Sequence, residues 1–315
     1  SPGWMLPSET TRRPGKRASK VLTSAAPPRR RRSEPTRRRS TRRGKRAAAD
    51  PTALKSAWTV PVYGNHATDP CYHTPANGGF AASQCTQVWR WNLDYVVDPS
   101  GNSMTYVYAT ETNHYVANVG QNTTGVATPY VSGGRLSRID YGTHTSAALT
   151  ANAPVQIVLT SAPRCITDPA NGSSLCTTGT SQPETKTWPD TPKDLQCKTT
   201  TGCLNYSPVF FDTTYLAAIT TQTHDGTAYR KVDKWSLAYK FTGEGEGSNV
   251  QYAANPILRL EKITRTGLGG TDVTTDDITL HPVRFGYEFL ENRVDAPTDG
   301  VFQIWRPRVN QVITD

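Results

Sequence analysis

The stretch Val88–Ala109 constrains the fold of this chain more than any other, because it has the pattern of a β-hairpin. Its first half alternates apolar and polar residues with a period of two, as a half-buried strand requires. A turn follows at residues 98–102, where Pro99 suits a φ near −65° and Gly101 tolerates a positive φ. We predict that the two strands pack through aromatic and apolar side chains. This hairpin core comprises Trp89, Trp91, Leu93, Tyr95, Tyr106 and Tyr108.

The same unit recurs further along the chain. A Leu-x-x-Ile phrase appears at residues 136–139, 216–219 and 260–263, and each phrase is followed by a turn and a strongly alternating segment. The alternating segments are centred on residues 155–159, 235–241 and 283–289. No window shows a capped helical period, so the predicted fold is all-β, with antiparallel hairpins in a curved, shell-like or blade-like array. The polar run Thr110–Ser132 is predicted to be a long surface loop.

The charge of the chain divides it in two. Residues 1–50 hold 16 of the 35 Lys and Arg residues and 3 of the 26 acidic residues, a net charge of +13, and residues 51–315 carry −4. The first segment is of low complexity and too polar to bury a core, so we predict that residues 1–50 are disordered and that 51–315 form the β-rich domain.

The basic segment has three possible interpretations: an extension without function, a solvated linker, or an arm that binds anions or nucleic acid. No aromatic residue lies between Pro14 and Ala57 to stack on bases, so physiological nucleic-acid binding is not expected. No apolar run approaches the roughly 18 residues of a membrane span. Because the chain starts at Ser1 and its first Met is residue 5, we expect it to be a fragment or a processed product of a longer protein.

An even number of cysteines in loop-like surroundings favours disulfides and an oxidising compartment. Pairing of sequence neighbours is the simplest of the 15 connectivities, but the sequence does not choose among them. A metal site that combines Cys71 and Cys85 with His66 and His73 is the alternative, although its spacing matches no structural zinc pattern. The candidate disulfide residues are Cys71, Cys85, Cys165, Cys176, Cys197 and Cys203.

Catalytic signals are weak. The serine hydrolase, zinc protease and P-loop motifs are absent, and glycines 267, 269 and 270 are better explained by a hairpin turn. The carboxylates at 272, 276 and 277 lack calcium-loop spacing, and the histidines at 114, 144, 224 and 281 each stand alone. We therefore predict no catalytic residue, no cofactor and no metal, and a protein that is not an enzyme.

Several phrases together carry a family resemblance. They are WRWNLDYVVDPSGNSMTYVY, GRLSRIDYGT, WPDTPKDLQC, YLAAITTQTHDG, WSLAYKF and NRVDAPTDGVFQIWRPRV. In their order, over residues 60 to 310, the chain resembles the secreted RHS/YD-repeat proteins of actinobacteria, which are related to the B component of insecticidal toxin complexes and to polymorphic toxins. The resemblance implies a β-hairpin shell that encloses and helps deliver a C-terminal toxin. The regular Tyr-Asp repeats and the self-cleavage motif of that family are missing here.

These observations predict a non-enzymatic structural β segment of a secreted or cell-surface RHS-repeat toxin-delivery protein. Its partners would be the remainder of the shell or a toxin domain. The alternative is an extracellular module that binds carbohydrate or another cell-surface ligand through exposed aromatic residues such as Trp188 and Tyr206.

Overall fold

The computed structural model describes residues 54–120, 123–146, 152–165, 188–197, 203–241, 257–269, 277–291 and 305–314. The chain divides into two units, Ser1–Arg42 and Arg43–Asp315, and all described residues belong to the second. The prediction that residues 1–50 are disordered lies outside the described residues and stays a prediction.

The described chain is almost entirely antiparallel β-sheet, as the sequence predicts. A two-stranded sheet pairs β1 (Ala57–Tyr63) with β2 (Gln84–Trp91), and the helices among the described residues are short: η2 (Pro75–Asn77), α2 (Gly79–Ala82) and η4 (Lys193–Leu195). A second sheet has ten strands and does not close on itself. Its strands are β3 (Tyr95–Val97), β4 (Asn102–Gly120), β5 (Thr123–His144), β6 (Val155–Pro163), β7 (Thr214–His224), β8 (Tyr229–Phe241), β9 (Leu258–Gly267), β10 (Ile278–Thr279), β11 (Val283–Glu291) and β12 (Trp305–Ile313).

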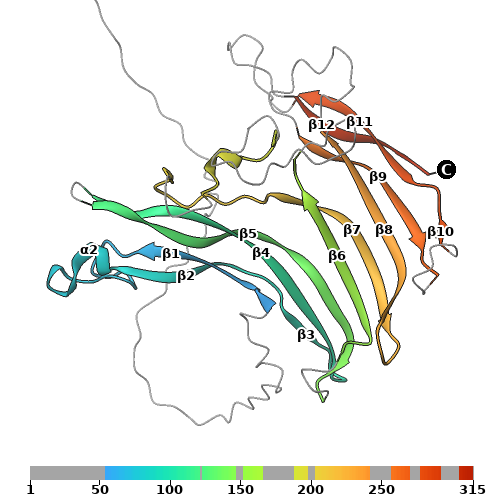
Figure 1. Ribbon diagram of the computed structural model, residues 1–315, viewed down its shortest axis with the longest axis horizontal. Helices are drawn as coiled ribbons and strands as arrows, with labels where there is room; N and C mark the ends of the chain where they lie inside the picture. The colour runs from blue at the N-terminus through green and yellow to red at the C-terminus, as the bar shows by residue number, and fades with distance from the viewer. Residues whose placement is uncertain are drawn as a thin grey trace, which may run out of the picture. The chain divides into compact units, whose positions relative to one another are not determined.

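The large sheet is a meander in which neighbouring strands follow chain order from β3 to β12, with β10 as a short addition to β9 (Figure 1). Each of the three Leu-x-x-Ile phrases lies on a strand that pairs with its predicted partner segment. In each partner segment, the residue that pairs with the isoleucine of the phrase is apolar. The pairs are Ile139 with Ile157, Ile219 with Trp235, and Ile263 with Val283.

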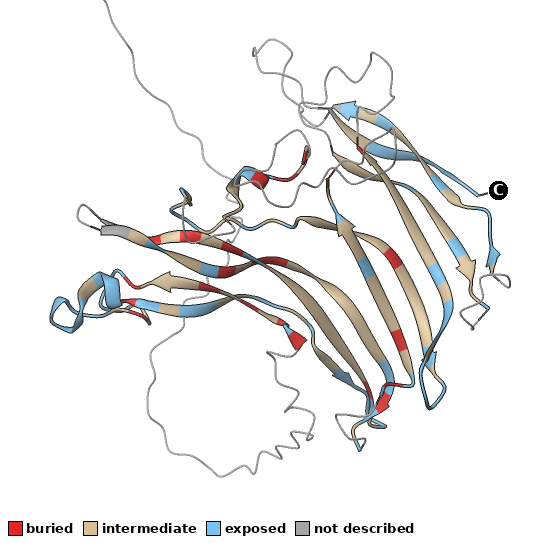
Figure 2. Cartoon of the chain, viewed as in Figure 1, coloured by how far each residue is buried: buried red, intermediate tan, exposed pale blue. Residues whose placement is uncertain are grey.

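This register brings the predicted apolar positions together on one face of the sheet, because directly paired residues lie on the same face. Leu159 pairs with Ile219, and Leu237 pairs with Ile263, which links β6 to β9 in the same way. The paired apolar residues are of intermediate exposure rather than buried. Tan, the colour of intermediate exposure, is the main colour of β6 to β9 in Figure 2. We call this surface the apolar face. It comprises Ile139, Ile157, Leu159, Ile219, Trp235, Leu237, Ile263 and Val283.

The prediction of a hairpin at Val88–Ala109 is only partly correct. The turn forms as expected: Asp98 and Asn102 share a backbone hydrogen bond of 3.0 Å, and Gly101 has a φ of +87°. β3 then pairs with residues 103–105 of β4. The first strand, however, is interrupted at residues 92–94, and its earlier part is β2, which pairs with β1 instead.

The interruption has a polar cause. The backbone N–H and the side-chain amide of Asn92 both donate to the Ser56 carbonyl, at 2.9 and 3.0 Å, and the Ser56 hydroxyl donates to Asp94. These bonds attach residues 92–94 to the start of β1. The same residues also contact β4, because the Asp94 carbonyl accepts from the Tyr106 N–H at 2.9 Å and the Leu93 carbonyl accepts from the Tyr108 hydroxyl at 2.8 Å.

The predicted packing role of Trp91 and Leu93 is therefore wrong, since both side chains are exposed and Trp91 retains 77% of its accessible surface. Trp58 on β1 is buried instead, at 3% exposure, and its ring contacts those of Trp89 and Tyr108. Tyr95, Tyr106, Tyr108 and Trp89 are half-buried.

The predicted loop at Thr110–Ser132 is also wrong, because β4 and β5 continue through it as one long hairpin. Asn113, Tyr115 and Ala117 alternate as buried residues on β4, and Tyr130 is buried beside them on β5. With Val60 of β1, Tyr115, Ala117 and Tyr130 form a core cluster. The small sheet thus covers this part of the large one.

Candidate functional site

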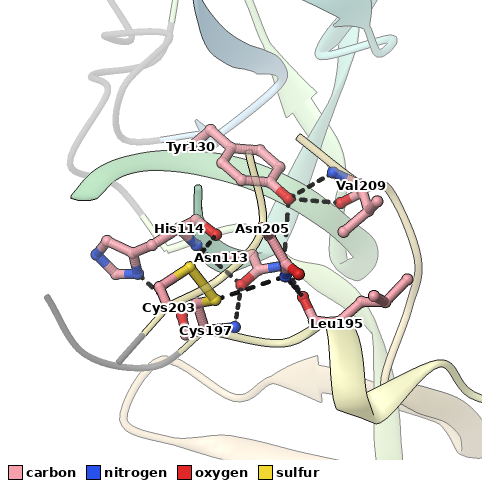
Figure 3. Close-up of a disulfide and its surroundings, with 8 residues drawn as sticks. All are labelled: Asn113, His114, Tyr130, Leu195, Cys197, Cys203, Asn205 and Val209. Carbon is pink, nitrogen blue, oxygen red and sulfur yellow. Dashed lines mark hydrogen bonds between the residues drawn. A yellow bond between two sulfur atoms is a disulfide. The ribbon is translucent and has the colours of Figure 1, made fainter. Parts of the chain in front are cut away.

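The best-defined polar site among the described residues surrounds Asn113 on β4 (Figure 3). Its side chain is 1% exposed. The amide nitrogen donates to the Tyr130 hydroxyl at 3.1 Å and to the Leu195 carbonyl at 3.0 Å, and the amide oxygen accepts from the N–H groups of His114 and Cys197, at 2.8 and 2.7 Å. Asn113 therefore joins β4 to residues that follow some 80 positions later in the chain.

Tyr130 extends this network. Its hydroxyl donates to the Val209 carbonyl at 2.7 Å and accepts from the Val209 N–H at 2.8 Å. Burial raises the pKa of the Tyr130 phenol, so it stays protonated and able to donate at neutral pH. The arrangement holds a segment in place and contains no nucleophile with an adjacent base.

Glu111 fixes the next part of the same segment. Its carboxylate accepts from the Thr213 N–H and hydroxyl at 2.9 and 2.8 Å, and from the Thr214 hydroxyl at 3.1 Å. It also pairs with Arg135 at 3.2 Å. Sequence reasoning missed Asn113 and Glu111 because both lie in the run that was expected to be a loop.

Two neighbour disulfides form, Cys71–Cys85 and Cys197–Cys203. Cys165 is disulfide-bonded as well, and Cys176 lies outside the described residues. Because Cys71 and Cys85 are bonded to each other, they cannot act as thiolate ligands of a metal with His66 and His73. Two disulfides indicate that the chain matures in an oxidising environment.

The four lone histidines occupy separate places. His114 contacts the Cys197 carbonyl, His144 contacts Ser146 and Ser100, and His224 accepts from the Gly226 N–H. His281 is exposed. The structure does not bring any two of these four histidines together.

The aromatic residues suggested for ligand binding differ in exposure. Trp188 is buried, at 6%, with the Lys193 ammonium 4.3 Å from its ring centroid, so it cannot stack on a sugar. Tyr206 is exposed. Trp91, which was expected in the core, is the more accessible aromatic platform.

No described helix is long and apolar enough to cross a membrane. No protein-family model matches the chain, and no curated protein matches it. Three solved structures are similar. The crystal structure of TcdB2-TccC3-Cdc42 has a TM-score of 0.32 and 14% identity. Those of TcdB2-TccC3-TEV and TcdB2-TccC3 each have a TM-score of 0.31, with 14% and 13% identity. In each case the match covers 75% of this chain and 10% of the other, so the chain spans about a tenth of the proteins it matches.

Proposed function

We propose that this chain is a non-enzymatic wall segment of a secreted RHS-repeat toxin-delivery protein, where it helps to enclose or present a C-terminal toxin. The observation that carries the proposal is the apolar face. It runs across β5 to β11 of an open meander, and its residues remain of intermediate exposure. A sheet with one apolar face needs apolar material against that face, and a wall around a cargo provides such an arrangement.

The sequence resemblance supports the same role. The phrases that resemble the RHS/YD-repeat proteins include WSLAYKF, which lies on β8 and contributes Trp235 and Leu237 to the apolar face. The aromatic and aliphatic residues of WSLAYKF lie on one strand and are half-buried or buried, as packing residues are. Export would follow from the oxidising environment that the disulfides require.

The test begins with the natural gene. Its coding sequence on both sides of residues 1–315 should encode further β-hairpins and a toxin domain, or lie beside a gene that does. If neither is present, the proposal is refuted.

The natural full-length protein then allows a protein-level test. Its C-terminal segment should resist a protease to which the same segment, expressed alone, is sensitive. Leu237→Glu places a charge on the apolar face and should abolish the protection, whereas Lys234→Glu on the opposite face of β8 should preserve it. Equal protection in both variants, with both folded, would contradict a wall that acts through the apolar face.

A second function is favoured by one observation, the exposure of Trp91. An exposed indole can stack on a sugar ring, and Tyr206 offers another such surface. A glycan array with the native chain tests this alternative. Binding that is lost in Trp91→Ala but kept in Phe80→Ala, another exposed aromatic residue, would support a carbohydrate-binding module. Absence of binding to any glycan would exclude it.

A further inference from the structure

The edge of β4 that faces away from β5 is covered mostly by residues outside strands. One edge of β4 pairs with β5 along its length, but β3 pairs with only residues 103–105 on the other side. Among the described residues no other strand pairs with this second edge. An open strand edge offers unpaired N–H and C=O groups to any extended chain, and folded proteins usually protect it.

The protection comes from residues around the Cys197–Cys203 disulfide. The Val116 N–H donates to the Asn205 carbonyl at 2.7 Å, and the Cys203 sulfur lies 3.7 Å from the His114 carbonyl oxygen. His114 Nδ1 also contacts the Cys197 carbonyl at 3.1 Å. We call the described residues Leu195–Cys197 and Cys203–Asn205 the edge cap, which lies beside β4 in Figure 3.

The disulfide sits between the two arms of the edge cap. Cys197 and Cys203 are six positions apart, and each arm contacts β4 within two residues of its cysteine. By the chain-entropy relation, a cross-link over six positions reduces the number of conformations open to the detached edge cap by roughly 40-fold. The disulfide thus strengthens a cap that hydrogen bonds alone hold less firmly.

This disulfide is also the more accessible one to a thiol. Cys197 and Cys203 are both of intermediate exposure, whereas in the Cys71–Cys85 disulfide only Cys85 is and Cys71 is buried. Each of the two disulfides has a side-chain amide donor, Asn205 at 3.5 Å from the Cys197 sulfur and Gln87 at 3.5 Å from the Cys85 sulfur. Within the Cys197–Cys203 pair, the donor stabilises a thiolate on Cys197 and makes this sulfur the better leaving group of the two.

We propose that Cys197–Cys203 is a redox-sensitive latch, and that a thiol reductant opens it and exposes the edge of β4 at residues 113–116. A thiolate of the reductant attacks Cys203, the sulfur–sulfur bond breaks, and its electron pair passes to Cys197, which takes up a proton. A second reductant thiolate then displaces Cys203 from the mixed disulfide. The cystine is reduced to two thiols, and two reductant thiols are oxidised to one disulfide.

The experiment uses the full chain with reduced glutathione as the reductant. Differential alkylation read by mass spectrometry should show Cys197 and Cys203 becoming free about ten-fold or more faster than Cys71 and Cys85. Hydrogen exchange of the β4 peptide around Val116 should accelerate at the same time, by roughly 40-fold if the latch carries the full entropic effect. The small sheet should remain protected.

Two double variants complete the design. Cys197→Ser with Cys203→Ser should exchange rapidly around Val116 without reductant and show no further response to it. Cys71→Ser with Cys85→Ser, the matched control, should keep slow exchange there and still respond. Unchanged exchange around Val116 in a native chain whose Cys197 and Cys203 are fully alkylated would overturn the proposal, as would earlier reduction of Cys71–Cys85.

Discussion

At the scale of single residues, Asn113 is the most connected buried polar side chain among the described residues, with four hydrogen bonds from one amide. Asn113→Ala would take the acceptor away from the N–H groups of His114 and Cys197, and would remove one of the hydrogen bonds to the Leu195 carbonyl and to the Tyr130 hydroxyl. We expect it to lower the free energy of unfolding by about 3 kcal/mol, measured by chemical denaturation. Thr112→Ala, at the exposed neighbouring position, should change it by no more than about 0.5 kcal/mol.

The tryptophans offer a second prediction at this scale. Trp58 is buried between Trp89 and Tyr108, so Trp58→Ala should cost about 3–5 kcal/mol of stability. Trp91→Ala removes an exposed ring and should cost less than about 1 kcal/mol. Thermal denaturation of the two variants compares them directly. A larger loss for Trp91→Ala would show that another molecule or a further part of the chain covers this ring.

At the scale of elements, Gly134 marks a close approach of β5 to its neighbours. A Cβ atom there would lie 2.6 Å from the Ala109 carbonyl oxygen and 2.9 Å from Trp58. Gly134→Ala should therefore destabilise the chain by about 1–3 kcal/mol in a denaturation experiment. Gly267→Ala on β9 is the control, because its nearest contact would be an ordinary 3.8 Å and no destabilisation is expected.

The stability that the turn between β7 and β8 contributes decreases in acid. The Ala228 N–H, the Arg230 guanidinium and the Thr227 N–H all donate to Asp225 and hold the pKa of its carboxyl well below the usual range. A depressed folded-state pKa contributes stability above the unfolded value near 4, and this contribution is lost as the pH falls below it. The stability difference between the native chain and Asp225→Asn should thus be largest near neutral pH and shrink below about pH 4.

Asp194→Asn, at an exposed position of η4, controls for the loss of one negative charge. Denaturation curves recorded from pH 7 down to acid provide the measurement. A difference between the native chain and Asp225→Asn that stayed constant across this range would contradict the role of the turn.

At the scale of the whole molecule, the open sheet presents apolar surface that a closed barrel would hide. β12 ends the strand order, and Val309 and Val312 on it are exposed. The purified chain should bind an apolar dye such as ANS and self-associate with rising concentration in analytical ultracentrifugation. Val312→Lys should weaken the association, and a strictly monomeric native chain without dye binding would contradict this prediction.

Much of the architecture could be predicted from local patterns. The Leu-x-x-Ile phrases identify β5, β7 and β9 and their partners, because period-two alternation and turn residues act over a few positions. The alternation in Val88–Ala109 does not reveal that β2 pairs with β1. That choice depends on Ser56, which lies more than thirty residues earlier and binds Asn92 and Asp94.

The sequence by itself determined the antiparallel β class and the turn at residues 98–102, since both depend on residues close together in the chain, whereas the choice among the cysteine pairings came from the structure. Only the tertiary structure decided which tryptophans are buried, how Asn113 and Glu111 are used, and that the Cys197–Cys203 segment covers the edge of β4. Burial depends on which distant segment lies against a face or an edge. Local periodicity describes the face but not the segment that covers it.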